Sequence, residues 1–377
     1  MREVRLGDII SIADVERCED NSYPTLSITM RDGIVLQSER FKKNIASVDK
    51  RNYKVVRYGQ LVVGFPIDEG VIYAQTIVDV GIMSPAYQVW NIDYTQVLSS
   101  YLEYYLHGPY AMKYYTAHLR GTTARRRSLP THIFLDLPVR LPDLEEQDRI
   151  VKVMNLAKRN FELYEQQLQK LDELVKARFV ELFGDIDENV PLSYYIMGLN
   201  AGKSLAGEDP CPNKVLKTSA VTYDNFDRKQ VKNLPLGYKP LEEHRVRKGD
   251  VIISRMNTIE LVGAAAYVWD VSMNTYLPDR LWRAEVKGNA CPIFVWQLLI
   301  QSSTKESIRR IASGTSGSMK NISKAGLLGI QVKKVDQTIQ KQFSAFVEQV
   351  YKTKLTIQKS LDKMEVLQKA LMQKYFG

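Results

Sequence analysis

The sequence predicts an α+β chain built from two globular parts, each followed by one long helix. Two observations carry this prediction. Apolar residues recur at alternating steps of four and three along residues 150–175, which is the pattern of a long amphipathic helix. The chain also matches itself at an offset of 193 residues, so this helix has a second copy near the C-terminus. The chain therefore contains an internal duplication.

The first long helix begins after the stretch "LPDLEEQDRI" at residues 141–150. Asp143 is a good N-cap, and Glu146 follows three residues later, which is the spacing of a capping box. Gly184 is a suitable C-cap. Such a helix is roughly 60 Å long, and its apolar stripe needs a partner to cover it. The stripe consists of Ile150, Met154, Ala157, Phe161, Tyr164, Leu168, Leu171 and Val175.

The second long helix is found through the repeat. The stretch "RGTT" aligns with "SGTS", and further along "LFG" aligns with the C-terminal "YFG", with no gap between these two anchors. Gln147 in the first copy matches Gln340 in the second. Lys354 and Gln368 interrupt the apolar stripe of the second helix. The remaining stripe residues are Phe343, Val347, Val350, Ile357, Leu361 and Met364. We therefore expect the two helices to pair with each other.

The two globular parts are less alike than the helices. Strand patterns dominate residues 4–90 and 190–285, and a helical stretch follows each of them. The segment "RYGQLVVGF" resembles "RKGDVIISR" at an offset of 190, and each reads as a glycine turn followed by an apolar strand. The expected divisions of the chain are a globular domain at 1–142, a long helix at 143–184, a second globular domain at 185–335 and a second long helix at 336–377.

Composition indicates a soluble, cytoplasmic protein. The sequence has no apolar run long enough to cross a membrane, and its first residues lack the shape of a signal peptide. The three cysteines lie far apart and suggest neither a disulfide framework nor a zinc cluster. The net charge of +9 is compatible with nucleic-acid binding, and equally with an ordinary basic surface.

The start of the first helix resembles the central conserved region of specificity subunits of type I restriction–modification systems. In that family a proline-rich strand leads through "L-P-P-L-x-E-Q-x-x-I" into a long helix that ends near "F-G". The matching residues are Leu141, Pro142, Leu144, Glu146, Gln147 and Ile150. Asp143 stands where the family has its second proline. The second copy, "KKVDQTIQKQF", has neither the prolines nor the glutamate and is assigned through the repeat alone.

The resemblance implies two target recognition domains at opposite ends of an antiparallel coiled-coil pair of helices, with an internal pseudo-twofold repeat. Each domain is expected to read one half of a split double-stranded DNA sequence, and the helices to fix the gap between the halves. The expected partners are two methyltransferase subunits that modify adenine N6, together with restriction subunits that translocate and cleave DNA. The chain itself is expected to be non-catalytic, without a cofactor. The helix-pairing residues are expected to be Ile150, Met154, Phe161, Leu168, Leu171, Val350, Ile357, Leu361 and Met364.

Candidate DNA contacts lie mainly in two equivalent loops. "RGTTARRRS" leaves a helix through a glycine and supplies hydroxyls and three arginines, which suit phosphate and guanine contacts. The equivalent "SGTSGSMKNIS" keeps the hydroxyls and one lysine. The stretch "SRMNT" adds an arginine and an asparagine suited to guanine and adenine. The candidates are Thr122, Thr123, Arg125, Arg126, Arg127, Arg255, Asn257, Arg280, Ser316, Ser318 and Lys320.

Other functions remain open from the sequence. The chain would look the same in a system that only methylates DNA, and a coiled-coil scaffold with two protein-binding heads is a further alternative. The stretch "PDRLWRAEVK" also contains Asp279, Glu285 and Lys287, a carboxylate–lysine pattern typical of magnesium-dependent nucleases. These three residues could form a site only if separate strands aimed them at one point. No phosphate-binding loop, methyltransferase motif or glycine-rich cofactor loop is found in the sequence. The DNA half-sites and their spacing cannot be predicted from sequence.

Overall fold

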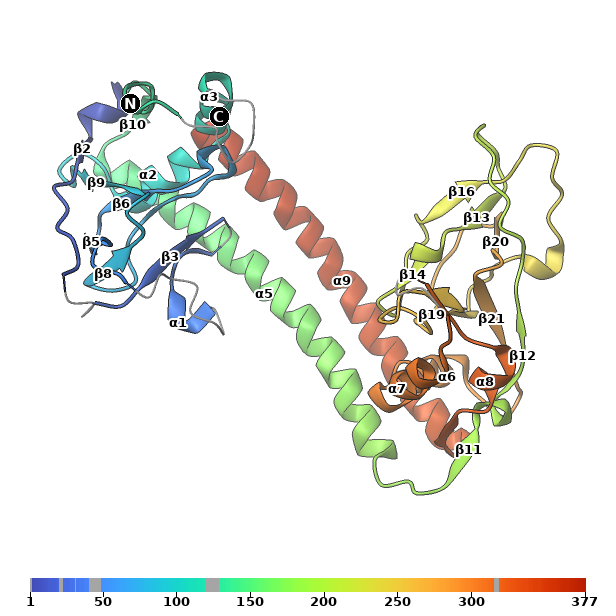
Figure 1. Cartoon of the computed structure of the whole chain (residues 1–377). Coiled ribbons are helices and arrows are strands. Elements are labelled where there is room, and N and C mark those ends of the chain that lie inside the picture. The colour runs from blue at the N-terminus through green and yellow to red at the C-terminus, as the bar shows by residue number, and fades with distance from the viewer. Residues whose placement is uncertain (1, 20–22, 31, 41–48, 120–128, 315–318) are drawn as a thin grey trace. The chain divides into compact units, whose positions relative to one another are not determined.

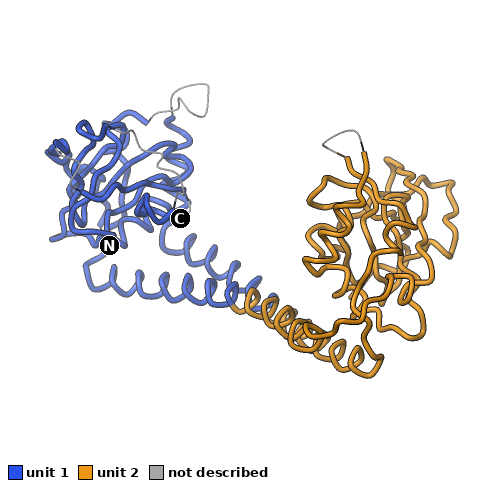
Figure 2. The backbone as a smooth tube through the Cα atoms, turned by 60° about the horizontal axis from the view of Figure 1, so that its bottom comes forward, with its two compact units in different colours: residues 1–166, 358–377 blue, residues 167–357 orange. Residues whose placement is uncertain are grey.

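The structure is a computed structural model that describes residues 2–19, 23–30, 32–40, 49–119, 129–314 and 319–377. The chain divides into two compact units (Figure 2). The first unit contains residues 1–166 together with 358–377, and the second contains residues 167–357. Each unit consists of one head and parts of both long helices.

The head of the first unit is built on an antiparallel four-stranded sheet (Figure 1). Its strand order is β2 (Ile10–Ile12), β9 (Gln88–Ile92), β6 (Leu61–Val63) and β7 (Ile72–Ala74). Three antiparallel pairs accompany it: β1 (Arg2–Arg5) with β10 (Pro138–Leu141), β3 (Leu26–Thr29) with β4 (Gly33–Leu36), and β5 (Lys54–Arg57) with β8 (Val80–Met83). The helices are α1 (Gln37–Arg40), α2 (Ser99–Leu106), α3 (Pro109–His118) and α4 (Thr131–Leu135).

The head of the second unit has a sheet of the same kind. Its order is β12 (Ile196–Asn200), β21 (Leu281–Val286), β17 (Val251–Ser254) and β19 (Ala265–Tyr267). Smaller sheets join β11 (Asn189–Pro191) to β23 (Gln331–Lys333), β14 (Val221–Thr222) to β15 (Asn225–Phe226), β18 (Met256–Asn257) to β22 (Lys320–Asn321), and β13 (Lys214–Leu216) to β16 (Val231–Asn233) and β20 (Thr275–Tyr276). The helices are α6 (Pro292–Leu299), α7 (Ser302–Ile311) and α8 (Lys324–Leu328).

The duplication predicted from the sequence is confirmed, and it is longer than the sequence indicated. Helices α2, α3 and α4 recur as α6, α7 and α8 with both ends displaced by 193 residues. The central sheets also correspond strand for strand, because β6 and β17 occupy the same place in the two strand orders. These two strands contain the "RYGQLVVGF" and "RKGDVIISR" segments, so the weak similarity between them reflects a shared structural position.

The two long helices are α5 (Leu144–Phe183) and α9 (Gln337–Phe376), each 40 residues long. Asp143 is the N-cap of α5, since its Oδ1 accepts a hydrogen bond of 2.9 Å from the Glu146 N–H. The carboxylate of Glu146 accepts two hydrogen bonds from Arg149. Glu146 therefore forms an ion pair with a residue one turn further along the helix. At 1.5 Å per residue, each helix is roughly 60 Å long, as the sequence predicted.

The two helices pack against each other in an antiparallel direction within each unit. In the second unit, Lys354 Nζ donates to Asp172 Oδ1 at 2.6 Å. In the first unit, Gln368 Nε2 donates to the Ala157 carbonyl at 3.2 Å. These are the two polar residues that interrupt the apolar stripe of the second helix. Both of them make hydrogen bonds to the neighbouring helix.

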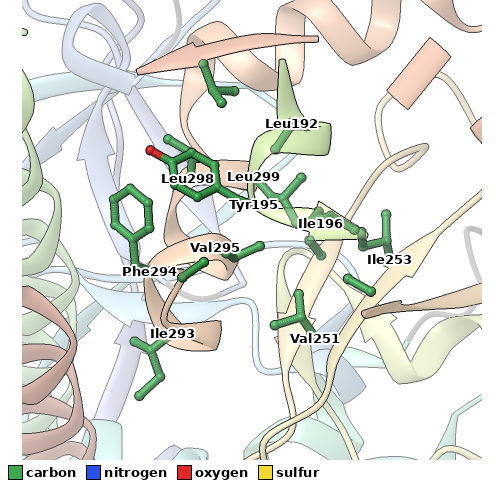
Figure 3. Close-up of a cluster of buried hydrophobic side chains, with 14 of the residues drawn as sticks. Leu192, Tyr195, Ile196, Val251, Ile253, Ile293, Phe294, Val295, Leu298 and Leu299 are labelled. Atoms are coloured by element: carbon green, nitrogen blue, oxygen red, sulfur yellow. The ribbon is translucent and has the colours of Figure 1, made fainter. Parts of the chain in front are cut away.

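Each head has its own core, and both long helices contribute to it. Phe376 at the end of α9 lies in the core of the first unit, where its ring is 5.5 Å from that of Tyr101. Phe183 at the end of α5 lies in the core of the second unit, 5.4 Å from Phe294 (Figure 3 shows part of this core). These two phenylalanines are repeat equivalents, so the ends of the two helices are anchored in the same way.

The expected helix-pairing residues fall into two groups. Ile150, Met154 and Val350 are buried and belong to the cores of the heads. The others are half-buried on the helices, as is typical of a two-helix seam; they are Phe161, Leu168, Leu171, Ile357, Leu361 and Met364. Their role in pairing the helices stays a prediction.

Candidate nucleic-acid interface

In the second unit, residues predicted from separate parts of the sequence lie next to one another. Strand β18 follows β17 directly and pairs antiparallel with β22, so that Asn257 lies opposite Lys320. The N–H of Arg255 donates to the Arg280 carbonyl at 3.1 Å. Four of the candidate DNA contacts therefore lie together where β17 ends and β21 begins.

Arg255 is held in place by its neighbours. Its Nε donates to Asn321 Oδ1 at 3.4 Å, and its guanidinium lies 5.6 Å from the ring centre of the buried Trp282. Its carbonyl also accepts a hydrogen bond of 3.1 Å from the Ile322 N–H. Arg255 therefore joins β17, β21 and the segment that follows α7.

The other three residues differ in their exposure. Arg280 is exposed and immediately precedes β21. Asn257 is half-buried, and its Oδ1 accepts a hydrogen bond of 2.9 Å from the Thr258 N–H, which orients the side-chain amide. Lys320 Nζ donates to the Gly314 carbonyl at 2.8 Å. This edge thus presents cationic and amide donors, which suit phosphate oxygens and base edges.

The remaining candidates lie outside the described residues. They are Thr122, Thr123, Arg125, Arg126, Arg127, Ser316 and Ser318. The chain re-enters the described part of the first head at Leu129, and α4 begins shortly after it at Thr131. Gln88 at the start of β9 donates to Thr131 Oγ1 at 3.4 Å. This contact joins the start of β9 to the start of α4.

The equivalent edge of the first head has a different chemistry. At the offset of 190, Phe65 corresponds to Arg255, and it follows β6 as Arg255 follows β17. Its side chain is 57% exposed, and its ring lies 6.4 Å from that of Tyr87, just before β9. Sequence reasoning missed Phe65 because an aromatic residue after an apolar strand is usually part of a core. Its alignment with an arginine candidate was the available signal.

The residues of the suggested nuclease pattern do not come together. Asp279 accepts a hydrogen bond from the Ser204 hydroxyl, whereas Glu285 accepts one from the Asn200 amide. Residues 279 and 285 lie before and near the end of the single strand β21, so they are separated by roughly 20 Å along the chain direction. Within the described ranges, no group of three or more metal-ligating side chains is found. The nuclease alternative therefore has no support from the geometry.

The length and apolar character of the helices in the described ranges show whether any of them could span a membrane. None of them is both long enough and apolar enough to span a bilayer. Helices α5 and α9 have the necessary length, but charged residues alternate with their apolar stripes.

Comparison with known proteins supports the architecture of two diverged heads on a pair of duplicated helices. No protein-family model matches the chain. The chain is 24% identical over 163 residues to the type I restriction enzyme EcoEI specificity subunit of Escherichia coli. This match spans 42% of the chain and only 27% of the length of that relative.

Solved structures extend the similarity to the entire chain. The S subunit of a type I restriction–modification system from M. genitalium is matched over 100% of this chain and 96% of its own, with a TM-score of 0.58 and 13% identity. A second match is a chain from a structure that describes complex assembly and conformational transition of the type I restriction–modification system. It is matched over 100% of this chain and 97% of its own, with a TM-score of 0.56 and 18% identity. The chain thus has the fold of type I specificity subunits, and the resemblance predicted from its sequence is confirmed.

Proposed function

We propose that this chain is a non-catalytic specificity subunit that recognises a bipartite DNA sequence, one half with each head. The observation that carries this proposal is the relation between the two heads. They share one strand order and one set of helices, yet they present Phe65 and Arg255 at the same position. A common frame with different side chains at one edge is what two different half-sites require.

The second head offers donors that match DNA bases. Arg280 is exposed and bonds through its carbonyl to Arg255, two residues before Asn257. The side chains of Arg280 and Asn257 suit a guanine and an adenine in the major groove. Lys320 lies opposite Asn257 and suits a backbone phosphate. Arg255, whose guanidinium is held by Asn321 and Trp282, would position the edge.

The long helices offer two equivalent surfaces for partner subunits. Leu174 on α5 and Leu367 on α9 are repeat equivalents, and their side chains are 47% and 45% exposed. Apolar side chains at equivalent exposed positions suit two copies of the same partner. We assign them to two adenine-N6 methyltransferase subunits, and the resulting complex would in turn recruit the restriction subunits. The helices would set the gap between the half-sites.

The direct test is DNA binding by the chain in complex with its methyltransferase subunits. Binding is expected to depend on sequence in two separated blocks and to weaken steeply with salt. Arg280→Gln is expected to lower discrimination at one position of one block by tenfold or more, and to leave the other block unchanged. Arg228→Gln is the matched control, because Arg228 is an exposed arginine of the same head that pairs with Asp270. Equal binding to all duplexes, whatever their sequence, would contradict the proposal.

A further inference from the structure

Phe65 is an exposed aromatic side chain on the edge where the second head has Arg255. Strand β6 pairs with β9 as β17 pairs with β21, so the residues that leave β6 and β17 occupy the same position next to the central strand. The Phe65 ring packs near the ring of Tyr87, just before β9, and the Arg255 guanidinium lies over the ring of Trp282 near the start of β21. The same place thus has an apolar side chain in one head and a cation in the other.

The first head holds Phe65 on a rigid support. Tyr87 is half-buried and packs against the core, and its carbonyl accepts a hydrogen bond of 2.6 Å from Lys54 Nζ. Gly64 lies so close to the neighbouring strand that an added Cβ would stand 2.7 Å from Val71 Cγ1. The backbone before Phe65 is therefore fixed against the core, while the Phe65 ring stays largely exposed.

Lys54, which bonds to the Tyr87 carbonyl, lies next to a second cation, because Arg17 and Lys54 are paired in an isolated β-bridge. The pKa of Lys54 is lowered, first by burial of its amine and then by the neighbouring charge of Arg17. Two cations held this near to each other favour an anionic partner. An exposed ring on a residue pair that also bonds to a lysine suits a nucleic acid, which offers phosphates and apolar base groups together.

We propose that Phe65, supported by Tyr87, is a specificity residue of the first head that packs against the C5 methyl group of a thymine in its half-site. This inference rests on the proposed function. A phenyl ring can donate no hydrogen bond to a base edge, so it cannot read guanine or adenine as arginine or asparagine does. The thymine methyl is the apolar group that the major groove presents, and phenylalanine is among the side chains that contact it.

The test uses the complex with its methyltransferase subunits and duplexes that contain its recognised sequence. Each thymine of the two half-sites is replaced in turn by deoxyuridine, which lacks only the methyl group. At one thymine the wild-type complex is expected to lose roughly fourfold in affinity, the value of one buried methyl group. The Phe65→Ala complex is expected to bind the thymine and uracil duplexes equally at that position, and its salt dependence is expected to be unchanged.

Two further variants sharpen this test. Tyr58→Ala is the matched control, because Tyr58 is 62% exposed on the same head and precedes β6 at the opposite end of the strand. It is expected to keep the full sensitivity to uracil. Phe65→Gln replaces the ring with a polar chain and is expected to behave as Phe65→Ala does. It serves as the test if the alanine variant loses its fold, which a melting curve reports.

The outcomes separate this inference from the function on which it rests. If the wild-type complex shows no sequence dependence, the proposed function fails. If it reads a split sequence, but Phe65→Ala keeps its sensitivity to uracil, the inference alone is overturned. If that variant binds both duplexes more weakly by the same factor, the ratio between them is unchanged, and the ring acts as a wedge between bases and not as a reader of the methyl group. The inference is overturned as well if the wild-type complex loses no affinity at any thymine that is replaced.

Discussion

Gln147 and Gln340 make the same three hydrogen bonds at equivalent places in the two units. Gln147 Nε2 donates to the carbonyls of Pro142 and Gln96, each at 2.9 Å, and its Oε1 accepts from the Leu98 N–H at 2.9 Å. The three partners of Gln340 lie 193 residues further along the chain. They are the Val335 carbonyl at 2.9 Å, the Asn289 carbonyl at 3.4 Å and the Cys291 N–H at 3.0 Å.

This pair explains how each head holds its long helix. Both glutamine side chains are completely buried. Each joins the first turns of a long helix to the residues just before α2 in the first head or α6 in the second. A buried amide that satisfies three backbone groups fixes the direction in which the long helix leaves the head, because any other packing would leave those groups unpaired.

Loss of this amide is expected to loosen the first head. Gln147→Leu keeps the size of the side chain but leaves the Leu98 N–H and two carbonyls without their partner, which is expected to cost about 2–4 kcal/mol in local stability. Hydrogen exchange of the amides in α2 measures the effect. Gln169→Leu is the control on the same helix, since Gln169 is exposed and its side chain bonds to the exposed Glu173 on the same helix. Equal exchange rates in the two variants would contradict the assigned role.

The stability of the first unit is expected to depend on the protonation of Glu103. Burial raises the pKa of this α2 carboxyl, against the opposing hydrogen bond of 3.1 Å from the Ala74 N–H and the charges of His107 and Lys158. The folded chain therefore holds this proton more tightly than the unfolded chain does. The resulting stabilisation is fully present below the unfolded pKa and is lost as the pH rises through the folded pKa.

A substitution at this position tests the sign of the effect. Glu103→Gln keeps an acceptor for the Ala74 N–H and cannot ionise, so it is expected to melt at a higher temperature than the wild type at neutral pH. The advantage is expected to shrink as the pH falls toward the unfolded pKa. Glu162→Gln, an exposed change on α5, serves as the control. A constant difference at every pH would show that the charge is not involved.

The second head is attached to α9 by a stacked pair of aromatic rings, at a position where the repeat in the first unit has a lysine. The rings of Trp269 and Tyr351 lie 3.8 Å apart and within 8° of parallel, and the repeat equivalent of Tyr351 is Lys158. Trp269→Ala is expected to lower the local stability of the second head by about 2 kcal/mol, because Trp269 is half-buried and its stacking with Tyr351 is lost. Hydrogen exchange is expected to rise in the second head only. Trp269→Phe should restore part of the protection, and a rise in both heads would count against a local effect.

The spacing role of the helices can be tested by lengthening both of them. The pairing of Asp172 with Lys354 places Leu168 near Ile357, so four helical residues are inserted after each of these positions. Four residues add roughly 6 Å to each helix and keep the apolar stripe nearly in phase. The gap between the half-sites is expected to grow by one or two base pairs, with both half-sites unchanged. An altered half-site with the original gap would contradict the spacing role.

Local signals in the sequence were enough to predict the long helices. Asp143 as an N-cap and the heptad stripe depend on neighbours within a few residues, and the structure contains both features. From the sequence, Lys354 and Gln368 could be described only as interruptions of the apolar stripe. Their hydrogen-bond partners lie on the other helix, far away in sequence.

The candidate interface was predicted only in pieces. Arg255, Asn257, Arg280 and Lys320 are predicted from short stretches of sequence, but the pairing of β18 with β22 has no local signal, since it joins segments more than sixty residues apart. Phe65 was missed because exposure is a property of the folded head. A sequence alone does not show which aromatic side chain the core leaves uncovered.

The central claim is that this chain directs adenine methylation to one split DNA sequence. A genome-wide map of N6-methyladenine in the host, with and without the gene, tests this claim most directly. One bipartite motif is expected to lose its methylation on deletion, and restoring the gene with Arg280→Gln is expected to alter one half of the motif only. Unchanged methylation on deletion, in cells that express the gene and its methyltransferase subunits, would contradict it.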